Sequence, residues 1–238
     1  IPLWRVWLHI ARAPQLMKFG VVTFPGSNCD EDMIHVLGNT MGQSVVRLWH
    51  KDHDLKGVDM VVLPGGFSFG DYLRSGAIAR FSPIMQEVAA HAKKGGLVFG
   101  VCNGFQVLCE AGLVPGALLH NEGQKFIARN TFIRPATTHT ALTSAVPNRA
   151  LKIPIAHGEG RFHADANTLK AIKDDDQVLF RYCEPDGRIT DAANPNGSKE
   201  NIAGVCNKGR NVFGMMPHPE RAADERLGNT DGRSLFES

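Results

Sequence analysis

What the sequence lacks sets the first limits on its function. No apolar run approaches the roughly 18 residues of a membrane-spanning helix. No charge of one sign dominates, because 26 basic and 24 acidic residues leave a net charge of +2. We therefore expect neither a membrane nor a nucleic acid as a partner. The five cysteines are odd in number and show no paired spacing, which favours a reducing, cytoplasmic compartment over a disulfide framework.

The first sixteen residues differ from the rest of the chain. They read IPLWRVWLHIARAPQL, in which Arg5 and His9 interrupt the apolar core of a secretory leader, and no clean cleavage site follows. We expect residues 1–16 to be an extension outside the fold, with Met17 as the natural start. Residues 17–238 are expected to form one domain, because no linker or change of composition divides them.

The first half of this domain alternates between short apolar runs and helical patterns. Strands are predicted at 18–24, 44–49, 58–63 and 97–101, and helices at 30–41, 83–94 and 103–111. This alternation predicts a three-layer α/β fold around a mostly parallel sheet, with functional residues at the carboxyl ends of its strands. The second half predicts antiparallel additions, with one helix at 166–173 and strands at 126–134, 151–156, 178–182, 202–206 and 212–216.

The strongest local signal is Gly-Val-Cys-Asn-Gly at 100–104, between an apolar strand and a helix. This is the glycine-x-nucleophile-x-glycine pattern of a nucleophile elbow, with cysteine in the serine position. The glycines avoid collisions at a sharp turn, and the N-terminus of the following helix favours a thiolate. Cys102 is therefore the candidate nucleophile, although a buried core cysteine is the alternative. The remaining cysteines are expected to be structural: Cys29, Cys109, Cys183 and Cys206.

A cysteine nucleophile needs a base and a group that orients the base. Met-Pro-His-Pro-Glu at 216–220 follows a predicted strand, and its prolines keep the chain extended. Side chains two residues apart then project to the same side. His218 and Glu220 are thus predicted to lie side by side, with the carboxylate fixing the tautomer of the imidazole. A surface loop with an incidental histidine and glutamate is the alternative.

A glycine pair follows the third predicted strand. Pro-Gly-Gly-Phe-Ser-Phe-Gly-Asp at 64–71 has the glycine spacing of a phosphate-binding loop, but Asp71 and Tyr72 replace its lysine and its serine or threonine. The glycines instead let backbone amides approach a ligand. In an elbow enzyme, the amide after the nucleophile, here Asn103, and an amide of a neighbouring loop, here Gly66, stabilise an oxyanion.

Together these elements resemble the class I, triad-type glutamine amidotransferases, which have a flavodoxin-like architecture. Further stretches resemble the glutaminase subunits of phosphoribosylformylglycinamidine synthases, enzymes of purine biosynthesis. The resemblance spans about residues 17–238. It is carried by FPGSNCD at 24–30, PGGFSFGDYLR at 64–74, GVCNGFQ at 100–106, AHGEGRF at 156–162 and MPHPER at 216–221.

The resemblance implies a role for individual residues. Cys102, His218 and Glu220 would form the catalytic triad. The backbone amides of Gly66 and Asn103 would hold the oxyanion. Six further residues would contact the substrate: Gly65, Gln106, His157, Gly158, Glu159 and Gly160. No metal or cofactor is expected on this chain.

The implied reaction is hydrolysis of L-glutamine to glutamate and ammonia through a cysteine thioester. The ammonia would pass to a large synthetase subunit, which uses ATP and magnesium to convert formylglycinamide ribonucleotide to formylglycinamidine ribonucleotide. A small third subunit would bridge the two. One alternative is a DJ-1-like cysteine-elbow hydrolase or stress protein, whose histidine just after the cysteine is missing here. Another is a non-catalytic regulatory domain of the same fold, against which the intact triad argues.

Overall fold

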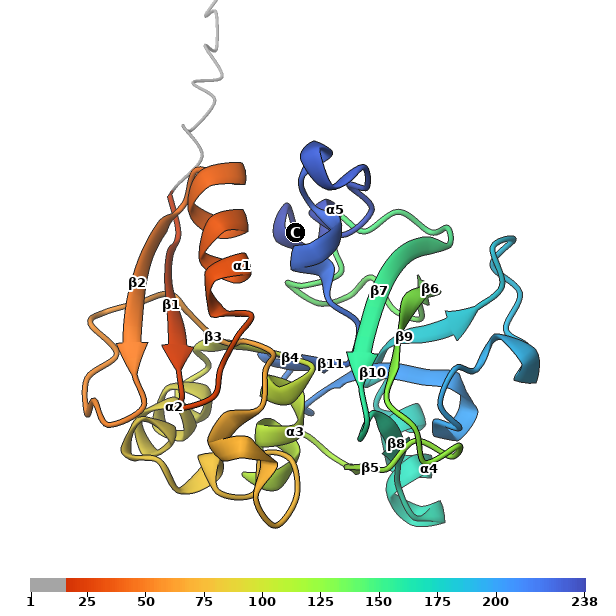
Figure 1. The fold of residues 1–238 in the computed structure, drawn as a ribbon, viewed down its shortest axis with the longest axis horizontal. Coiled ribbons are helices and arrows are strands. Elements are labelled where there is room, and N and C mark those ends of the chain that lie inside the picture. Colours follow the sequence, from red (N-terminus) through yellow and green to blue (C-terminus); the bar gives the residue numbers. More distant parts are fainter. Residues whose placement is uncertain (1–15) are drawn as a thin grey trace, which may run out of the picture.

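The computed structural model describes residues 16–238, so the predicted extension lies outside the described residues except for Leu16. A nine-stranded sheet crosses the molecule in the order β2-β1-β3-β4-β11-β10-β9-β6-β7 (Figure 1). Its parallel part consists of β2 (Ser44–Trp49), β1 (Lys18–Thr23), β3 (Met60–Leu63), β4 (Leu97–Val101) and β11 (Val212–Met215). Its antiparallel part consists of β10 (Ile202–Cys206), β9 (Val178–Cys183), β6 (Ile127–Pro135) and β7 (Leu151–His157).

Helices cover both faces of the parallel part, which gives the predicted three layers. In Figure 1, α1 (Asp30–Ile34) and α5 (Arg233–Phe236) lie above the central strands, and α2 (Pro83–Lys93) and α3 (Asn103–Glu110) lie below them. A further helix, α4 (Ala166–Asp174), precedes β9. Across residues 16–238, none of the helices has both the length and the apolar character that spanning a membrane requires.

The register of the central strands brings their carboxyl ends together. Gly100 of β4 pairs with Leu63 of β3 on one side and with Gly214 of β11 on the other. All three strands are almost entirely buried, as expected for parallel strands covered by helices on both faces. The segments that follow these strands carry the glycine pair, the cysteine elbow and the His-Pro-Glu sequence, so all three motifs meet at one edge of the sheet.

The predicted α/β fold with antiparallel additions is confirmed, and three details differ. The first helix changes after Ile34 to π-helical hydrogen bonding over His35–Thr40. A single helix was expected in the second half, which is wrong because α5 also forms there. Its four residues are too few to produce a periodic pattern, and burial of Leu235 anchors them. Two short strands, β5 (Ala117–Leu119) and β8 (Arg161–His163), form a separate small sheet that the pattern did not indicate.

We predict that Gly104→Ala destabilises the fold, because α3 packs directly on the backbone of β3. A Cβ atom at this position would lie 1.9 Å from the carbonyl oxygen of Leu63, and a backbone oxygen in a central strand cannot move aside. The free energy of unfolding should fall by about 1–3 kcal/mol or more. Urea denaturation checks this. Gly123→Ala is the control, because a Cβ there meets nothing within 4 Å. Equal stability of both variants would contradict the prediction.

Candidate active site

Cys102 occupies a strained turn between β4 and α3. Its backbone angles are φ 51° and ψ −107°, a combination that residues with side chains rarely adopt. A Cβ on Gly100 would lie 2.7 Å from the backbone of Gly104, so Gly100 is required by the close approach of the turn to itself, and Gly104 by its approach to the backbone of Leu63. The Cys102 amide donates to the carbonyl of Met215 at 2.8 Å, and its thiol points toward the carbonyl of Ala156 at 3.6 Å. The turn therefore fixes the direction of the sulfur.

His218 and Glu220 lie side by side, as predicted. Nδ1 of His218 is 2.6 Å from Oε1 of Glu220, and both side chains are fully buried. The amide of His218 donates to the carbonyl of Pro154 at 2.9 Å, which ties this segment to β7. Burial opposes the charged form of the imidazole, but Glu220 and the sulfur atoms of Cys102 and Cys29 outweigh it, so the pKa of His218 lies well above its usual value. His218 is thus set up as an imidazolium beside the sulfur.

Gly65 brings the elbow and the histidine together. A Cβ on Gly65 would lie 2.7 Å from Cε1 of His218 and 3.4 Å from Cβ of Cys102. Any side chain at this position would therefore fill the space between the two catalytic candidates. The structure brings Cys102, His218 and Glu220 into one buried cluster, although the three lie on segments more than 100 residues apart in the chain. The assignment of catalytic roles remains a prediction.

Gly66 lies next to Cys102 in a conformation that favours glycine. Its φ is 142°, and a Cβ there would lie 2.8 Å from the amide nitrogen of Asn28. An isolated bridge to Ser27 holds it in place. The side chain of Asn103 is also fixed, because its Oδ1 accepts a hydrogen bond from the amide of Ser68 at 3.1 Å. The two residues predicted to supply oxyanion donors are therefore held in place next to the nucleophile.

Two small cavities adjoin Cys102. The first, of about 140 Å³, also has Gln106, His157, Gly158 and Glu159 in its wall, all four of them predicted substrate contacts. The second, of about 160 Å³, is bordered by His218 and by residues of the loop after β1. Both cavities share the following five wall residues: Gly66, Phe67, Cys102, Phe126 and Ala156.

Two predicted substrate contacts lie outside the walls of these cavities. Gly65 borders the space between Cys102 and His218, as described above. Gly160 lies behind the wall of the first cavity, where its amide donates to Oδ1 of Asn121 at 3.1 Å and its carbonyl accepts from Nδ2 of Asn196 at 2.8 Å. The structure thus gives Gly160 a supporting position, because the turn after His157 needs its backbone to be held by these two amide side chains.

Two of the wall residues are fixed by their own hydrogen bonds. Burial, together with the nearby charge of His218, lowers the pKa of His157 to about 4, so His157 is neutral at physiological pH. Its Nδ1 lies 3.0 Å from Oδ1 of Asn121. The side-chain amide nitrogen Nε2 of Gln106 donates to the backbone carbonyl of Glu159 at 2.6 Å. The helix that carries the nucleophile is therefore bonded directly to the opposite wall of the cavity.

Cys29 lies in the site, although the sequence analysis expected it to be a structural cysteine. Its Sγ is 3.1 Å from Nη2 of Arg221. The sulfur also lies within 4.8 Å of a ring nitrogen of His218 and a carboxylate oxygen of Glu220, a spacing that a metal ion could bridge. The guanidinium of Arg221 next to the sulfur repels a cation, so the arrangement does not favour a metal. Sequence spacing gave no sign of this position, because Cys29 and Arg221 are 192 residues apart.

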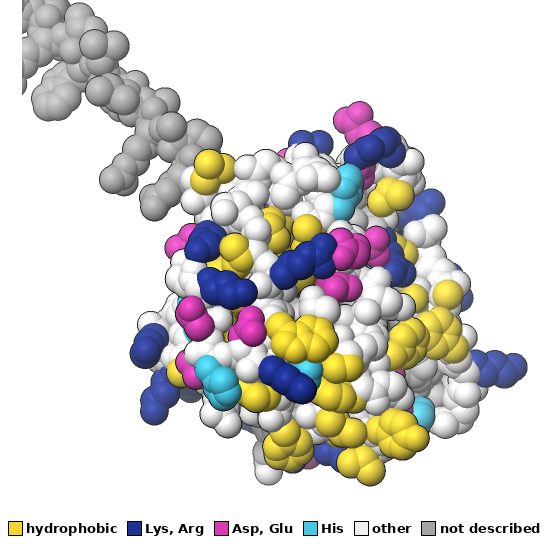
Figure 2. Space-filling view, turned by 60° about the vertical axis from the view of Figure 1, so that its left-hand side comes forward, with side chains coloured by type: hydrophobic (Ala, Val, Ile, Leu, Met, Phe, Trp, Pro, Cys, Tyr) yellow, Lys and Arg dark blue, Asp and Glu magenta, His cyan; other side chains and the backbone are white. Residues whose placement is uncertain are grey.

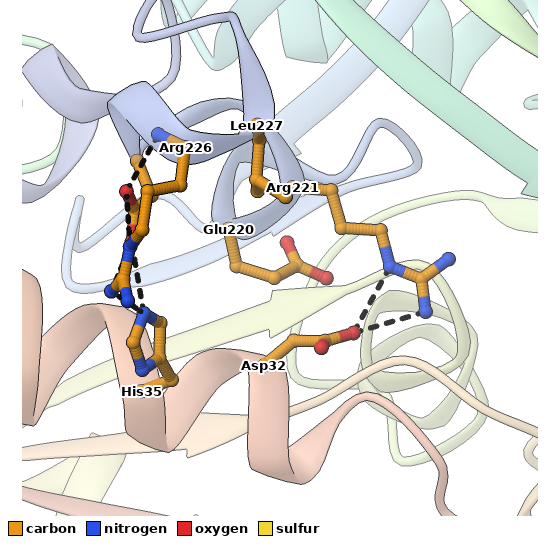
Figure 3. A pocket seen from close by; sticks show the side chains of 7 residues that line it. Asp32, His35, Glu220, Arg221, Arg226 and Leu227 are labelled. Atoms are coloured by element: carbon orange, nitrogen blue, oxygen red, sulfur yellow. Dashed lines mark hydrogen bonds and ion pairs between the residues drawn. The ribbon is translucent and has the colours of Figure 1, made fainter.

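A larger cavity of about 650 Å³ lies on the far side of Glu220, between α1 and the C-terminal segment (Figure 3). Arg221 forms an ion pair with Asp32 of α1 at 3.1 Å. Asp224 contacts both His35 and Arg226 at 2.9 Å. The contacts of Arg221 with Asp32 and of Asp224 with His35 cross the cavity, and they hold the C-terminal segment that carries Glu220 against α1 and the π-helical turn after it.

We predict that Glu220→Gln lowers the pKa of His218. The substitution removes the negative charge that stabilises the imidazolium and leaves the burial that opposes it. The pKa should fall by at least about one unit, equivalent to roughly 1.4 kcal/mol. Titration of the ring nitrogen shifts by nuclear magnetic resonance checks this. Glu31→Gln, which alters a surface carboxylate paired with Arg47, is the control. An unchanged His218 titration in Glu220→Gln would refute the proposed origin of the shift.

Comparison with known proteins places this site in a family. Residues 17–232 match the CobB/CobQ-like glutamine amidotransferase domain. The chain is 57% identical over 223 residues to the phosphoribosylformylglycinamidine synthase subunit PurQ of Koribacter versatilis, covering 93% of this chain and 96% of the relative. It is 54% identical over 222 residues to the PurQ subunit of Salinibacter ruber, covering 93% and 94%. A chain in the structure of PurLQS from Thermotoga maritima is similar in fold, with a TM-score of 0.80 and 40% identity over 93% of this chain and 96% of that chain. The chain therefore belongs to the family of CobB/CobQ-like glutamine amidotransferase domains.

Proposed function

We propose that this chain is the glutaminase subunit of phosphoribosylformylglycinamidine synthase. The observation that carries the proposal is the placement of Cys102 on a strained elbow, next to a buried imidazolium–carboxylate pair and two cavities. More than half of the chain is identical to PurQ subunits across almost their whole length. This agreement favours the amidotransferase over the DJ-1-like alternative, and the complete triad argues against a non-catalytic domain.

The reaction begins with attack by the Cys102 thiolate on the side-chain carboxamide of L-glutamine. The tetrahedral oxyanion lies against the backbone amides of Gly66 and Asn103, where the loss of one donor typically costs about 10²–10³ in rate. His218, protonated and held by Glu220, gives its proton to the departing nitrogen. Ammonia and a γ-glutamyl thioester on Cys102 result. Water, deprotonated by the now neutral His218, hydrolyses the thioester and releases glutamate.

The ammonia is used by a synthetase subunit, because in bulk water at neutral pH it would be protonated and lost. ATP and magnesium belong to that partner. The glycine loop of this chain has Asp71 in place of the lysine that a phosphate-binding loop needs. We place the chain in the cytoplasm, where its five free cysteines stay reduced.

A hydrophobic rim on the segment between β3 and α2 and just before β6 suits the partner. It consists of five exposed side chains: Phe67, Tyr72, Leu73, Phe81 and Phe126. Two of them, Phe67 and Phe126, also border the cavities next to Cys102. Figure 2 shows hydrophobic side chains gathered in the lower half of the face in view, with charges of both signs mostly above them. Clustered exposed hydrophobic side chains mark interaction surfaces. A synthetase subunit bound to this rim would cover the place where ammonia forms.

Replacing the nucleophile tests the proposed activity. In the complex with its synthetase partner, Cys102→Ala should abolish glutamine-dependent formation of the amidine product and retain the ammonium-dependent reaction, because only the nucleophile is lost. Cys109→Ala, on the same helix and packed against the core, is the matched control and should keep both reactions. The activities are measured by product formation with glutamine or with ammonium chloride. Glutamine-dependent turnover in Cys102→Ala would reject the mechanism.

Introducing a charge on the rim tests the docking surface. Leu73 is 87% exposed, so Leu73→Asp leaves the fold intact and buries a charge only when the partner binds. We expect its dissociation constant for the synthetase subunit to rise about tenfold or more, which is the size of a loss at an interface hot spot. Ile189→Asp, at an exposed hydrophobic residue outside the rim, is the control. Equal affinities in a binding titration would exclude the rim from the interface.

A further inference from the structure

Two of the five cysteines share one cavity. The second cavity beside Cys102, of about 160 Å³, has both Cys29 and Cys102 in its wall, together with His218 and Arg221. Cys29 lies in the loop between β1 and α1, far from the elbow in sequence. The proposed mechanism uses Cys102 as the nucleophile and gives Cys29 no part. A second thiol beside a reactive one adds a further chemistry, because two thiols can form a disulfide.

The missing side chain of Gly65 leaves a space that both cysteines border. A Cβ on Gly65 would lie 3.1 Å from Sγ of Cys29 and 3.4 Å from Cβ of Cys102. The amide of Cys29 donates to the carbonyl of Gly65 at 3.3 Å, which ties the loop of Cys29 to the segment after β3. A disulfide brings its two Cβ atoms to about 3.5–4.5 Å. Its formation here requires the Cys102 thiol to turn from the carbonyl of Ala156 into this space.

Cations lie next to the sulfur of Cys29. Nη2 of Arg221 is 3.1 Å from this Sγ, and an ion pair with Asp32 at 3.1 Å holds the guanidinium in place (Figure 3). The same sulfur lies within 4.8 Å of a ring nitrogen of His218, which is protonated. A neighbouring cation stabilises the negative charge that a thiol carries when it attacks another sulfur. Cys29 is therefore placed to attack an oxidised Cys102.

The other three cysteines are protected from oxidation. Burial raises the pKa of Cys183 and Cys206 to about 11, and that of Cys109 well above its usual value. None of the three borders either cavity beside Cys102. At neutral pH they remain thiols, the form that reacts slowly with oxidants. Cys29 is thus the cysteine that shares a cavity with the reactive thiol.

We propose that Cys29 and Cys102 form a redox pair, in which a hydroperoxide oxidises Cys102 and Cys29 then closes a reversible disulfide. The disulfide ties up the nucleophile and stops its chemistry, and it protects Cys102 from irreversible oxidation to a sulfinic acid. In a reducing compartment such a bond is transient, because cellular thiols open it again. The inference goes beyond the proposed glutaminase function, since the bond needs only the two thiols and an oxidant.

The reaction balances with His218 as the proton carrier. The Cys102 thiolate attacks one oxygen of hydrogen peroxide. A sulfur–oxygen bond forms, the oxygen–oxygen bond breaks, the sulfur is oxidised by two electrons, and His218 protonates the departing hydroxide. Neutral His218 then takes the thiol proton of Cys29. The Cys29 thiolate attacks the sulfenic sulfur of Cys102, the sulfur–sulfur bond forms, and His218 returns the proton to the second hydroxide. Two thiols, counted with the proton that Cys102 has given to His218, and one peroxide become one disulfide and two waters.

Mass spectrometry of the complex with the synthetase subunit tests the bond directly. The complex is treated with a small molar excess of hydrogen peroxide, the remaining thiols are blocked with iodoacetamide, and trypsin digests it without reductant. Trypsin releases Cys29 in peptide 19–47 and Cys102 in peptide 95–125. We expect these peptides to be joined after peroxide and separate after dithiothreitol. Fragmentation locates the bond, since peptide 95–125 also contains Cys109.

Cys29→Ser tests the protective role. Glutamine-dependent product formation is measured after prolonged exposure to peroxide and again after dithiothreitol, each relative to the untreated rate of the same variant. Wild type should lose this activity with peroxide and recover most of it with the reductant. In Cys29→Ser the recovered fraction should fall at least about threefold, because a sulfenic acid without a partner thiol is oxidised further and irreversibly. Cys109→Ala keeps both members of the pair and, as the matched control, should recover like wild type.

The outcomes are distinct. If peroxide-treated wild type contains no joined peptides, or carries the bond at Cys109, the inference is overturned, and this result stands even if Cys29→Ser fails to fold. Recovery of Cys29→Ser equal to that of wild type overturns it as well, because Cys29 then protects nothing. If the untreated complex forms no product from glutamine, the proposed function itself fails, whereas the joined peptides still decide the disulfide.

Discussion

The backbone of Cys102 is the constraint on which the site depends. Its positive φ is unfavourable by about 1–3 kcal/mol for a residue with a side chain, and the surrounding packing must enforce it. The enforcement comes from two glycines. Gly100 lets the turn pass close to the start of α3, and Gly104 lets that helix lie directly on the backbone of β3. Because the helix cannot shift, the positions of the sulfur, of the Asn103 amide and of the Gln106 side chain are set together.

Burial and the neighbouring groups together decide the charge of the two histidines around this turn. Two histidines lie near the sulfur, and their surroundings shift their pKa values in opposite directions. His218 has a carboxylate at 2.6 Å and a pKa well above its usual value, whereas His157 has a neutral amide partner and a pKa of about 4. One histidine therefore carries a proton for the chemistry, and the other is a neutral wall residue. A carboxylate in the right place outweighs the cost of burying a charge.

Much of the fold and the triad could be predicted from local sequence. The apolar run from Leu97 to Val101 became a strand with those boundaries, since parallel strands buried on both faces are continuously hydrophobic. The edge strand from Ser44 to Trp49 also has its predicted boundaries, although it is largely exposed. One rule predicted that the three motifs meet, because functional residues gather at the carboxyl ends of such strands. The position of Cys29 in the site could not be predicted, because nothing adjacent in sequence indicates its contact with Arg221. The position of Asp71 in the cavity wall could not be predicted either, because it depends on a backbone with positive φ angles that composition does not reveal.

The sequence by itself determined the parallel core, the elbow, the His-x-Glu pair and the family, because each depends on residues close together in the chain. The tertiary structure alone decided which groups share the space around the sulfur. It placed Cys29 and Arg221 beside the histidine, Gly160 behind the cavity wall, and Asp71 and Glu159, 88 positions apart in sequence, in the wall of one cavity. The physical reason is that charge and burial at a site depend on distances in space, and those are set by packing between segments.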